Sequence, residues 1–226
     1  VADGASETYT VNAYYNDNTN LTEGLTYILS VDGDTDLTVG GSGTQMGATS
    51  AVTNGTGSTV DVTATVLAFT TEPAGSTSGA ALTTQPVVTA QDAFGNTDVD
   101  FAETVTVTEA SAGTLTSGTV AAVSGVATVS GLIYTATADQ QSFTFTATAD
   151  DGVGSDIATT DASAVISDVV ATMLVFDTQP VPLITPSGEA TALTTVPVAS
   201  ARDGANVVDT GYSTGITLTE VNGAGA

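Results

Sequence analysis

Hydrophobic and polar residues alternate along several segments of this chain. In "TVTVTE" (104 to 109), "GVATVSGLIY" (125 to 134) and "SFTFTATAD" (142 to 150), apolar residues alternate with Thr, Ser or Gly. This period of two is typical of a strand with one buried face, and no long segment shows the period of a helix. Thr and Val, which branch at Cβ, are abundant and favour a pleated surface. The pattern predicts an all-β chain.

The chain also contains an internal repeat. "VLAFTTEP" at 66 to 73 recurs as "MLVFDTQP" 107 residues later, and "GLTY" at 24 to 27 recurs as "GLIY" at the same offset. "LTTQPVVTAQDAFGNTDVDF", which starts at residue 82, recurs as "LTTVPVASARDGANVVDTGY" after 111 residues. A unit of about 107 to 111 residues has the size of an immunoglobulin-like sandwich, in which two sheets enclose one core.

One complete unit lies between two partial ones. We call residues 66–171 the middle unit; by the repeat offsets, the head (1–65) is the C-terminal part of a unit and the tail (172–226) is the N-terminal part. The fold predicted is tandem immunoglobulin-like β-sandwiches, one complete and two partial. Because almost no linker separates the units, we expect them to be stiffly coupled. The strands expected in the middle unit are at about 66–71, 86–92, 98–108, 114–122, 125–134, 142–149 and 159–168.

Half of a sandwich alone exposes one side of its core and a row of unpaired backbone groups. A half of about 55 to 65 residues without a disulfide or a metal is marginally stable at best. We therefore predict that tail strands (about 173–220) pack with head strands (about 20–64) of the next copy, or of the next repeat in the same polypeptide. Such a contact propagates head-to-tail as a filament.

The charge of the chain excludes several classes of function. There are 25 acidic residues and one basic residue, Arg202, so the formal charge is −24. Nucleic-acid binding needs Lys and Arg to contact phosphates, and we expect none. Cys, His and Lys are absent, which removes Ser-His-Asp and Cys-His pairs, Schiff bases and the usual zinc ligands, so we predict no enzyme. No apolar run reaches the ~18 residues of a membrane span, and no membrane insertion is expected.

Oxygen ligands remain, and Ca²⁺ takes six to eight of them, so calcium is the one cofactor that we consider. Alternate aspartates in "DGDTD" resemble the start of a calcium loop, although the later Gly and Glu of an EF-hand are missing. A hairpin turn with solvated carboxylates is the favoured alternative for both candidate loops. These loops carry Asp32, Asp34 and Asp36, and Asp150, Asp151 and Asp156.

"LAFTTEPAGSTSGAALTTQPVVTAQDAFGNTDV", followed by "GVATVSGLIYTATA" and "FTFTATADDG", resembles the tandem bacterial immunoglobulin-like repeats of surface adhesins, invasin-like proteins and extracellular fibres. The resemblance covers nearly the whole chain, and its motifs are more specific for fold than for function. It implies an extracellular or cell-surface location, a structural role in a stalk, fibre or filament, and no catalytic residue. In the tail "DAFGN" becomes "DGAN" (203 to 206), which predicts a shorter turn there.

The alternative function is a carbohydrate- or receptor-binding module carried on such a stalk. That function needs an exposed aromatic platform, and "NAYYNDN", with Tyr14 and Tyr15, is the one cluster that suits it. Packing at a strand edge is the favoured interpretation of these tyrosines. Two glycosylation sequons, at Asn20 and Asn54, are as many as chance predicts for this composition.

Some charged residues have simpler expectations. Asp98 and Asp100 stand at the start of a predicted strand, and alternation points both to one face, which we expect to be solvated. Arg202 is expected to pair with Asp203 or Asp209, or with a neighbouring chain. An exposed pair of this kind is worth about 0 to 1 kcal/mol and carries no function.

Overall fold

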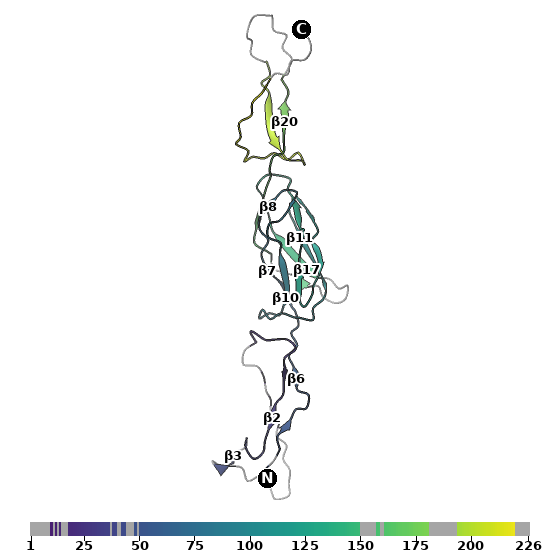
Figure 1. Cartoon of the computed structure of the whole chain (residues 1–226), viewed down its shortest axis with the longest axis vertical. Helices are drawn as coiled ribbons and strands as arrows, with labels where there is room; N and C mark the ends of the chain where they lie inside the picture. Colours follow the sequence, from purple (N-terminus) through teal and green to yellow (C-terminus); the bar gives the residue numbers. More distant parts are fainter. Residues whose placement is uncertain are drawn as a thin grey trace, which may run out of the picture.

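The computed structural model of this chain is elongated, and the head and the tail lie at opposite ends of the middle unit (Figure 1). The regular secondary structure of the described residues is all β-strand, which confirms the predicted fold class. The structure describes residues 18–36, 50–149, 161–180 and 194–219, together with positions 10, 12, 14, 38–39, 42–43, 48 and 157–158.

The middle unit consists of short strands. Among its described residues they form sheets of order β14-β10-β7, β13-β11-β17-β18, β12-β15-β9 and β16-β19-β8, in which β8 and β19 are parallel and the other pairs antiparallel. The strands are β7 (Val66–Thr71), β8 (Ser76–Thr77), β9 (Ala80–Ala81), β10 (Val87–Gln91), β11 (Thr104–Glu109), β12 (Thr114–Thr116), β13 (Thr119–Ala121), β14 (Val126–Thr128), β15 (Ile133–Thr135), β16 (Gln141–Phe143), β17 (Phe145–Ala149), β18 (Ile157–Ala158) and β19 (Val165–Asp168).

One hydrophobic core lies among these sheets. Alternate residues of β11 and β17 are buried, as the period of two predicts. Leu67 and Val88 are fully buried, and each such side chain contributes about 1.5 to 3 kcal/mol. Tyr134 stacks on Phe143 with 3.7 Å between ring centroids, and Phe143 meets Phe145 edge-on at 5.2 Å. Small sheets around a common core give the middle unit a sandwich-like fold.

Two predicted strands agree closely with the structure, and a third starts later than predicted. The strand predicted at 66–71 is β7, and the one predicted at 86–92 is β10, shorter by one residue at each end. The strand predicted at 98–108 begins only with β11. The reason is a turn before it, in which the buried Asp98 carboxylate accepts a hydrogen bond from the Phe101 N–H at 2.9 Å. Asp98 is therefore not on a solvated face, and that expectation was wrong.

The remaining predicted strands are divided or shortened. The segment 114–122 breaks into β12 and β13 at Ser117, whose φ of 65° cannot continue a strand. The segment 125–134 breaks into β14 and β15 at Gly131, with φ of 67°. At 142–149 the chain changes from β16, which pairs with β19, to β17, which pairs with β11. In the described part of the last predicted strand, residues 161–168, only β19 is strand.

The head pairs mainly with itself. Tyr27 in β1 lies opposite Ser58, whereas its repeat equivalent, Tyr134, lies opposite Ala80 and Leu115 in the first half of the middle unit. The counterparts of those two partners fall in the tail sequence, outside the described residues. The head strands are β1 (Thr26–Tyr27), β2 (Ser30–Val31), β3 (Thr38–Val39), β4 (Ser42–Gly43), β5 (Val52–Thr53) and β6 (Ser58–Thr59), paired as β1-β6, β2-β5 and β3-β4.

The tail, in contrast, repeats the start of the middle unit. Its strands β20 (Met173–Thr178) and β21 (Val198–Arg202) are antiparallel. Their sequence equivalents, β7 and β10, pair in the same register, and both pairs contain a register shift at the same place. Among the described residues of the tail, this hairpin is the whole of the regular strand structure.

Candidate functional site

Core positions of the repeat are exposed in the tail. Leu174 is 52% exposed, while Leu67, its equivalent in the middle unit, is 0% exposed. Leu218 is 57% exposed, while its equivalent Val107 is 3% exposed. Ile216 and Tyr212 are exposed in the same way, whereas their equivalents Val105 and Phe101 are buried. The described part of the tail therefore exposes apolar side chains whose equivalents are in the core of the middle unit.

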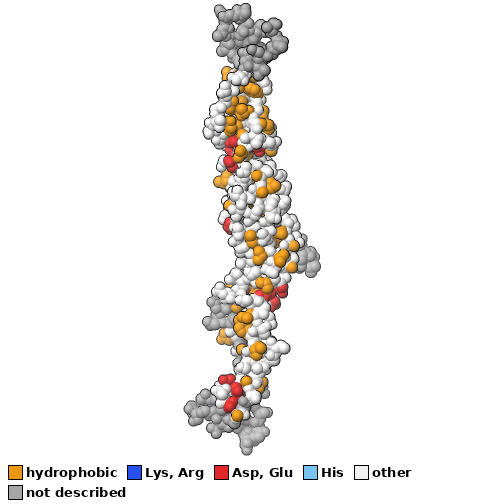
Figure 2. Space-filling model, viewed as in Figure 1, with side chains coloured by type: hydrophobic (Ala, Val, Ile, Leu, Met, Phe, Trp, Pro, Cys, Tyr) orange, Lys and Arg blue, Asp and Glu red, His pale blue; other side chains and the backbone are white. Residues whose placement is uncertain are grey.

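Leu174, Ile216 and Leu218 line a shallow groove. Its volume is about 230 Å³, and its wall joins β20 and β21 to the segment that follows them. Figure 2 shows hydrophobic side chains gathered on the tail in the same region. A groove of this size suits one or two apolar side chains of another strand. Its lining residues are Leu174, Val175, Phe176, Ala199, Ile216, Thr217, Leu218 and Thr219.

The head exposes the complementary set of positions. Tyr27 is 41% exposed, while its equivalent Tyr134 is 0% exposed, and Leu25 is exposed where Leu132 is buried. A second groove, of about 600 Å³, lies beside Tyr27. The head and the tail thus both expose positions that are buried at their equivalents in the middle unit. The head groove is lined by Tyr14, Leu21, Tyr27, Leu29, Asn54, Ser58, Thr59, Val60 and Asp61.

Hydrogen bonds join the head to the middle unit. The Ala64 N–H donates to Asp98 Oδ2 at 2.8 Å, and the Leu21 N–H donates to Asn96 Oδ1 at 2.8 Å. Asn96 Nδ2 also donates to the Asn18 carbonyl at 2.7 Å. The Val99 N–H donates to the Glu23 carboxylate. Two of these acceptors, Asp98 and Asn96, are side chains placed by the turn between β10 and β11.

Asp139 joins the middle unit to the tail. Its Oδ1 accepts from the Val169 N–H at 2.8 Å, and its Oδ2 accepts from the Thr210 N–H at 2.9 Å and from Thr210 Oγ1 at 2.5 Å. Partial burial raises the pKa of Asp139, but hydrogen bonds from Thr210, Val169 and Gln140 outweigh it and lower the pKa from 3.8 to about 2. The repeat could have indicated this position, because the equivalent residue in the head, Asp32, is also an aspartate.

A second contact is the same at both joints. Asp209 Oδ2 accepts from the Ala171 N–H at 3.0 Å, just as Asp98, its equivalent, accepts from Ala64. In the sequence, Asp209 is predicted only as a partner of Arg202. Acidic side chains are visible at the levels of both joints in Figure 2. The hydrogen bond between neighbouring units is therefore repeated along the chain, as the strand pairing is.

The turn that precedes these aspartates is also repeated. Asp203 Oδ1 accepts from the N–H groups two and four residues ahead, at 3.0 and 2.8 Å, and Asp92 does the same at 2.9 Å in each case. Asn206, with φ of 67°, takes the left-handed position that Gly95 occupies with φ of 85°. The expected shortening of this turn in the tail was wrong, because Asn tolerates that conformation.

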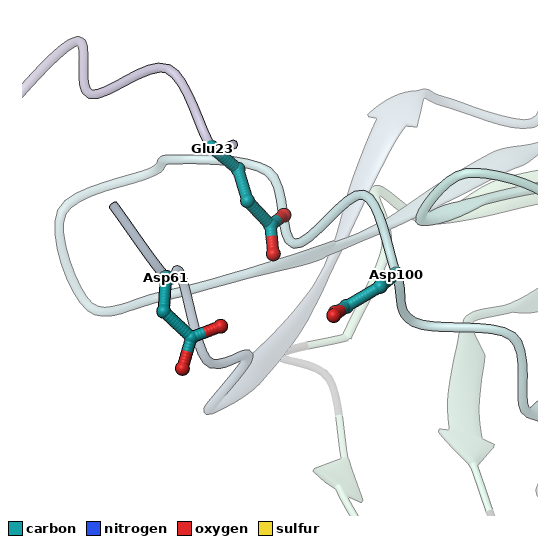
Figure 3. Close-up of side chains that lie close together, drawn as sticks. All are labelled: Glu23, Asp61 and Asp100. Carbon is teal, nitrogen blue, oxygen red and sulfur yellow. The ribbon is translucent and has the colours of Figure 1, made fainter. Parts of the chain in front are cut away.

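Three carboxylates from distant segments meet at the first joint. Glu23, Asp61 and Asp100 have ligand oxygens within 4.8 Å of one another (Figure 3). The pKa of Asp100 is raised, first by its hydrogen bond with the Asp98 carboxyl and then by the negative charge of Glu23. The group has the oxygen chemistry of a cation site, although exposed acidic groups are common without an ion. No local sequence pattern connects these residues.

The predicted calcium loop at Asp32, Asp34 and Asp36 is a turn. Asp36 Oδ2 accepts from the Asp32 N–H at 2.8 Å, and the Asp36 N–H donates to the Asp32 carbonyl at 2.8 Å. The three-carboxylate group found among the described residues does not include these aspartates. The other predicted loop, with Asp150, Asp151 and Asp156, lies outside the described residues.

The remaining candidates lie in the head. Tyr14 is exposed and lines the head groove, and Tyr15 is outside the described residues. Asn20 is exposed, with φ of 58°. Asn54 is exposed, yet its side chain accepts from the Leu29 N–H at 3.0 Å. A sugar on Asn54 would have to leave that hydrogen bond intact.

Arg202 pairs across the tail hairpin. Its guanidinium lies 2.7 Å from Asp177 Oδ1 and holds the pKa of that carboxyl below its usual value. The expected partners have other roles, because Asp203 caps its own turn and Asp209 accepts from Ala171. Asp203 directly follows Arg202, and successive side chains of a strand point to opposite faces, which disfavours an ion pair between the two.

A search of protein-family models finds no match to this chain, and a search of curated proteins finds no relative. Within the part of the chain that the structure describes, no helix is long and apolar enough to cross a membrane.

Proposed function

We propose that this protein is a structural repeat of an extracellular fibre, filament or adhesin stalk. Its units are tandem immunoglobulin-like β-sandwiches, and copies assemble head-to-tail when the tail of one copy and the head of the next complete a split sandwich. The observation that carries this proposal is the exposure, in the head and tail, of positions that are buried at their repeat equivalents in the middle unit.

Three features of the structure support this function. The three parts lie in a row, as a stalk requires (Figure 1). Both joints are held by hydrogen bonds rather than by a flexible linker, and one of these contacts is the same at each joint. The head and tail are at opposite ends, so neither can cover the other within one copy. A contact between the two ends of separate copies does not close on itself and propagates.

The test is self-association with two matched variants. Ile216→Asp places a charge in the tail groove, whereas Ile166→Asp changes an exposed isoleucine of the middle unit that lies outside both grooves. We expect wild type to form filaments as its concentration rises, and Ile216→Asp to need at least about tenfold more protein, since burial of an isoleucine is worth about 1.5 to 3 kcal/mol. Ile166→Asp should assemble like wild type in sedimentation velocity. A wild type that stays monomeric at high concentration contradicts the proposal.

One observation favours the alternative, a carbohydrate- or receptor-binding module on a stalk. Tyr14 is exposed beside the head groove of about 600 Å³, and an aromatic face beside a groove can stack on a sugar ring. Glycan-array binding by wild type that is lost in Tyr14→Ala would reverse the order of the two functions.

A further inference from the structure

The tail hairpin is prepared to receive a third strand. Ala199 lies opposite Phe176 just as Val88 lies opposite Phe69, and the register shift that follows is the same in both hairpins. Because the repeated hairpin already has the shape found in the complete unit, a strand that fits β10 should fit β21.

In the middle unit the third strand is β14, which pairs antiparallel with the second edge of β10. Val87 lies opposite Thr128, and the Ala90 N–H donates to the Gly125 carbonyl at 2.9 Å. In the tail the described sheet contains β20 and β21 alone, and no described strand occupies this edge of β21. An edge of this kind readily pairs with a strand from another chain.

The repeat identifies the missing strand. At the offset of 107, β14 corresponds to residues 19–21, which lie in the head at its joint with the middle unit, where the Leu21 N–H donates to Asn96 Oδ1; the middle unit separates them from β21 (Figure 1). We infer that β21 of one copy pairs antiparallel with residues 19–21 of a second copy, with Val198 opposite Leu21. This inference rests on the proposed function and adds to it the partner segment and the register.

The same register brings apolar side chains to the tail groove. Leu25 and Tyr27 follow residues 19–21 at the same spacing at which Leu132 and Tyr134 follow β14. In the middle unit, Leu132 and Tyr134 lie in the same hydrophobic core as Leu67. In the free chain β1 pairs with β6 and the head also contacts the middle unit, so assembly exchanges these contacts. We expect association to be slower than simple docking for that reason.

Engineered disulfides test the register, because the chain has no cysteine of its own. Residues directly opposite in antiparallel strands have Cα atoms about 4.5 to 5.5 Å apart, within the range that a disulfide spans. The test variant carries Leu21→Cys and Val198→Cys, and the control carries Thr22→Cys and Val198→Cys. A shift of one residue turns the side chain to the other face of the sheet, so the control cysteines should not meet.

We expect mild oxidation of the test variant to give a ladder of covalent dimers, trimers and longer species, at least tenfold more than the control. Sedimentation of reduced protein reports assembly independently, and circular dichroism reports that the middle unit is folded. If both variants assemble but neither forms the ladder, or both form it equally, the register is wrong while the proposed function stands. An intramolecular disulfide in a monomer also overturns the register. If wild type does not assemble, both proposals fail.

Discussion

Carboxylates hold this chain together at its joints by accepting backbone N–H groups. With a single cation in the whole sequence, ion pairs are nearly unavailable, and Asp98, Asp139 and Asp209 instead bind amide and hydroxyl donors of the adjoining unit. Hydrogen bonds to a charged group contribute about 1.5 to 3 kcal/mol, more than neutral ones. The acidic composition is therefore compatible with stiff joints, provided that the carboxylates remain ionised.

The first prediction concerns Asp139. Because its pKa in the folded chain, about 2, is below the ordinary 3.8, its contribution to the joint is fully present above about pH 4 and is lost as the pH falls toward 2. Asp139→Asn removes the charge, and we expect the protection factors of the Val169 and Thr210 amides at neutral pH to fall about tenfold in hydrogen exchange. The loss of protection between pH 4 and 2 should also disappear in this variant.

A matched control for that measurement is Asp161→Asn. The Asp161 carboxylate accepts from Thr146 Oγ1 at 2.7 Å within the middle unit. Equal loss of Val169 and Thr210 protection in both variants would show a general effect of lowered charge and would contradict a specific role for Asp139.

Sequence reasoning found some joint residues but not what they do. Asp98 stood out, yet strand alternation pointed it to solvent, because the turn that buries it depends on hydrogen bonds with Ala64 and Phe101. The meeting of Glu23, Asp61 and Asp100 depends on how the head packs on the middle unit, which no local pattern contains.

Strands were predictable where one alternating run ends at an ordinary turn, as in β7 and β10. They were not predictable where the chain changes sheets within such a run. Ser117 interrupts a run of strand-forming residues with a positive φ, which a serine in the sequence does not indicate. The change from β16 to β17 leaves the alternation of apolar and polar residues intact. A period of two indicates which side chains of a strand are buried, but it does not indicate which strand pairs with it.

The second prediction concerns the hairpin turn between β13 and β14. Ser124 and Gly125 have φ of 51° and 77°, the positive values of a two-residue hairpin turn, and a Cβ on Gly125 would overlap the Asp98 carbonyl oxygen. Gly125→Ala should therefore cost the strain of a left-handed alanine, about 1 kcal/mol, plus about 1 to 3 kcal/mol for the displaced backbone.

Gly79→Ala is the matched control for the turn, since Gly79 has φ of 75° and open space where its Cβ would lie. It should show the conformational cost alone. Thermal denaturation followed by circular dichroism compares the two, and a lower Tm for Gly125→Ala by several degrees is expected. Equal Tm values would mean that the turn adjusts to the added Cβ without displacing Asp98.

Over the whole chain, a charge of −24 opposes the compact state and also opposes contact between copies. The raised pKa of Asp100 is a local sign of that repulsion, since Glu23 and Asp98 lie close to it at a joint. Pairing of the head with a second copy would bring further acidic residues together, so the apolar grooves must outweigh the repulsion. Assembly should accordingly be favoured by salt, which screens charges over about 10 Å at 0.1 M.

The third prediction separates screening from specific binding of calcium. Sodium chloride should raise the Tm by screening, and calcium at a few millimolar should raise it further at equal ionic strength, by several degrees, because Ca²⁺ binds hard oxygen ligands and the chain offers carboxylates and carbonyls in quantity. Melting curves in chelator, in sodium chloride and in calcium chloride of matched ionic strength make the comparison. Magnesium is the control cation, because it demands stricter geometry and retains its water. If the curves in calcium and sodium coincide, the negative charge is merely screened and calcium has no part in the stability of this protein.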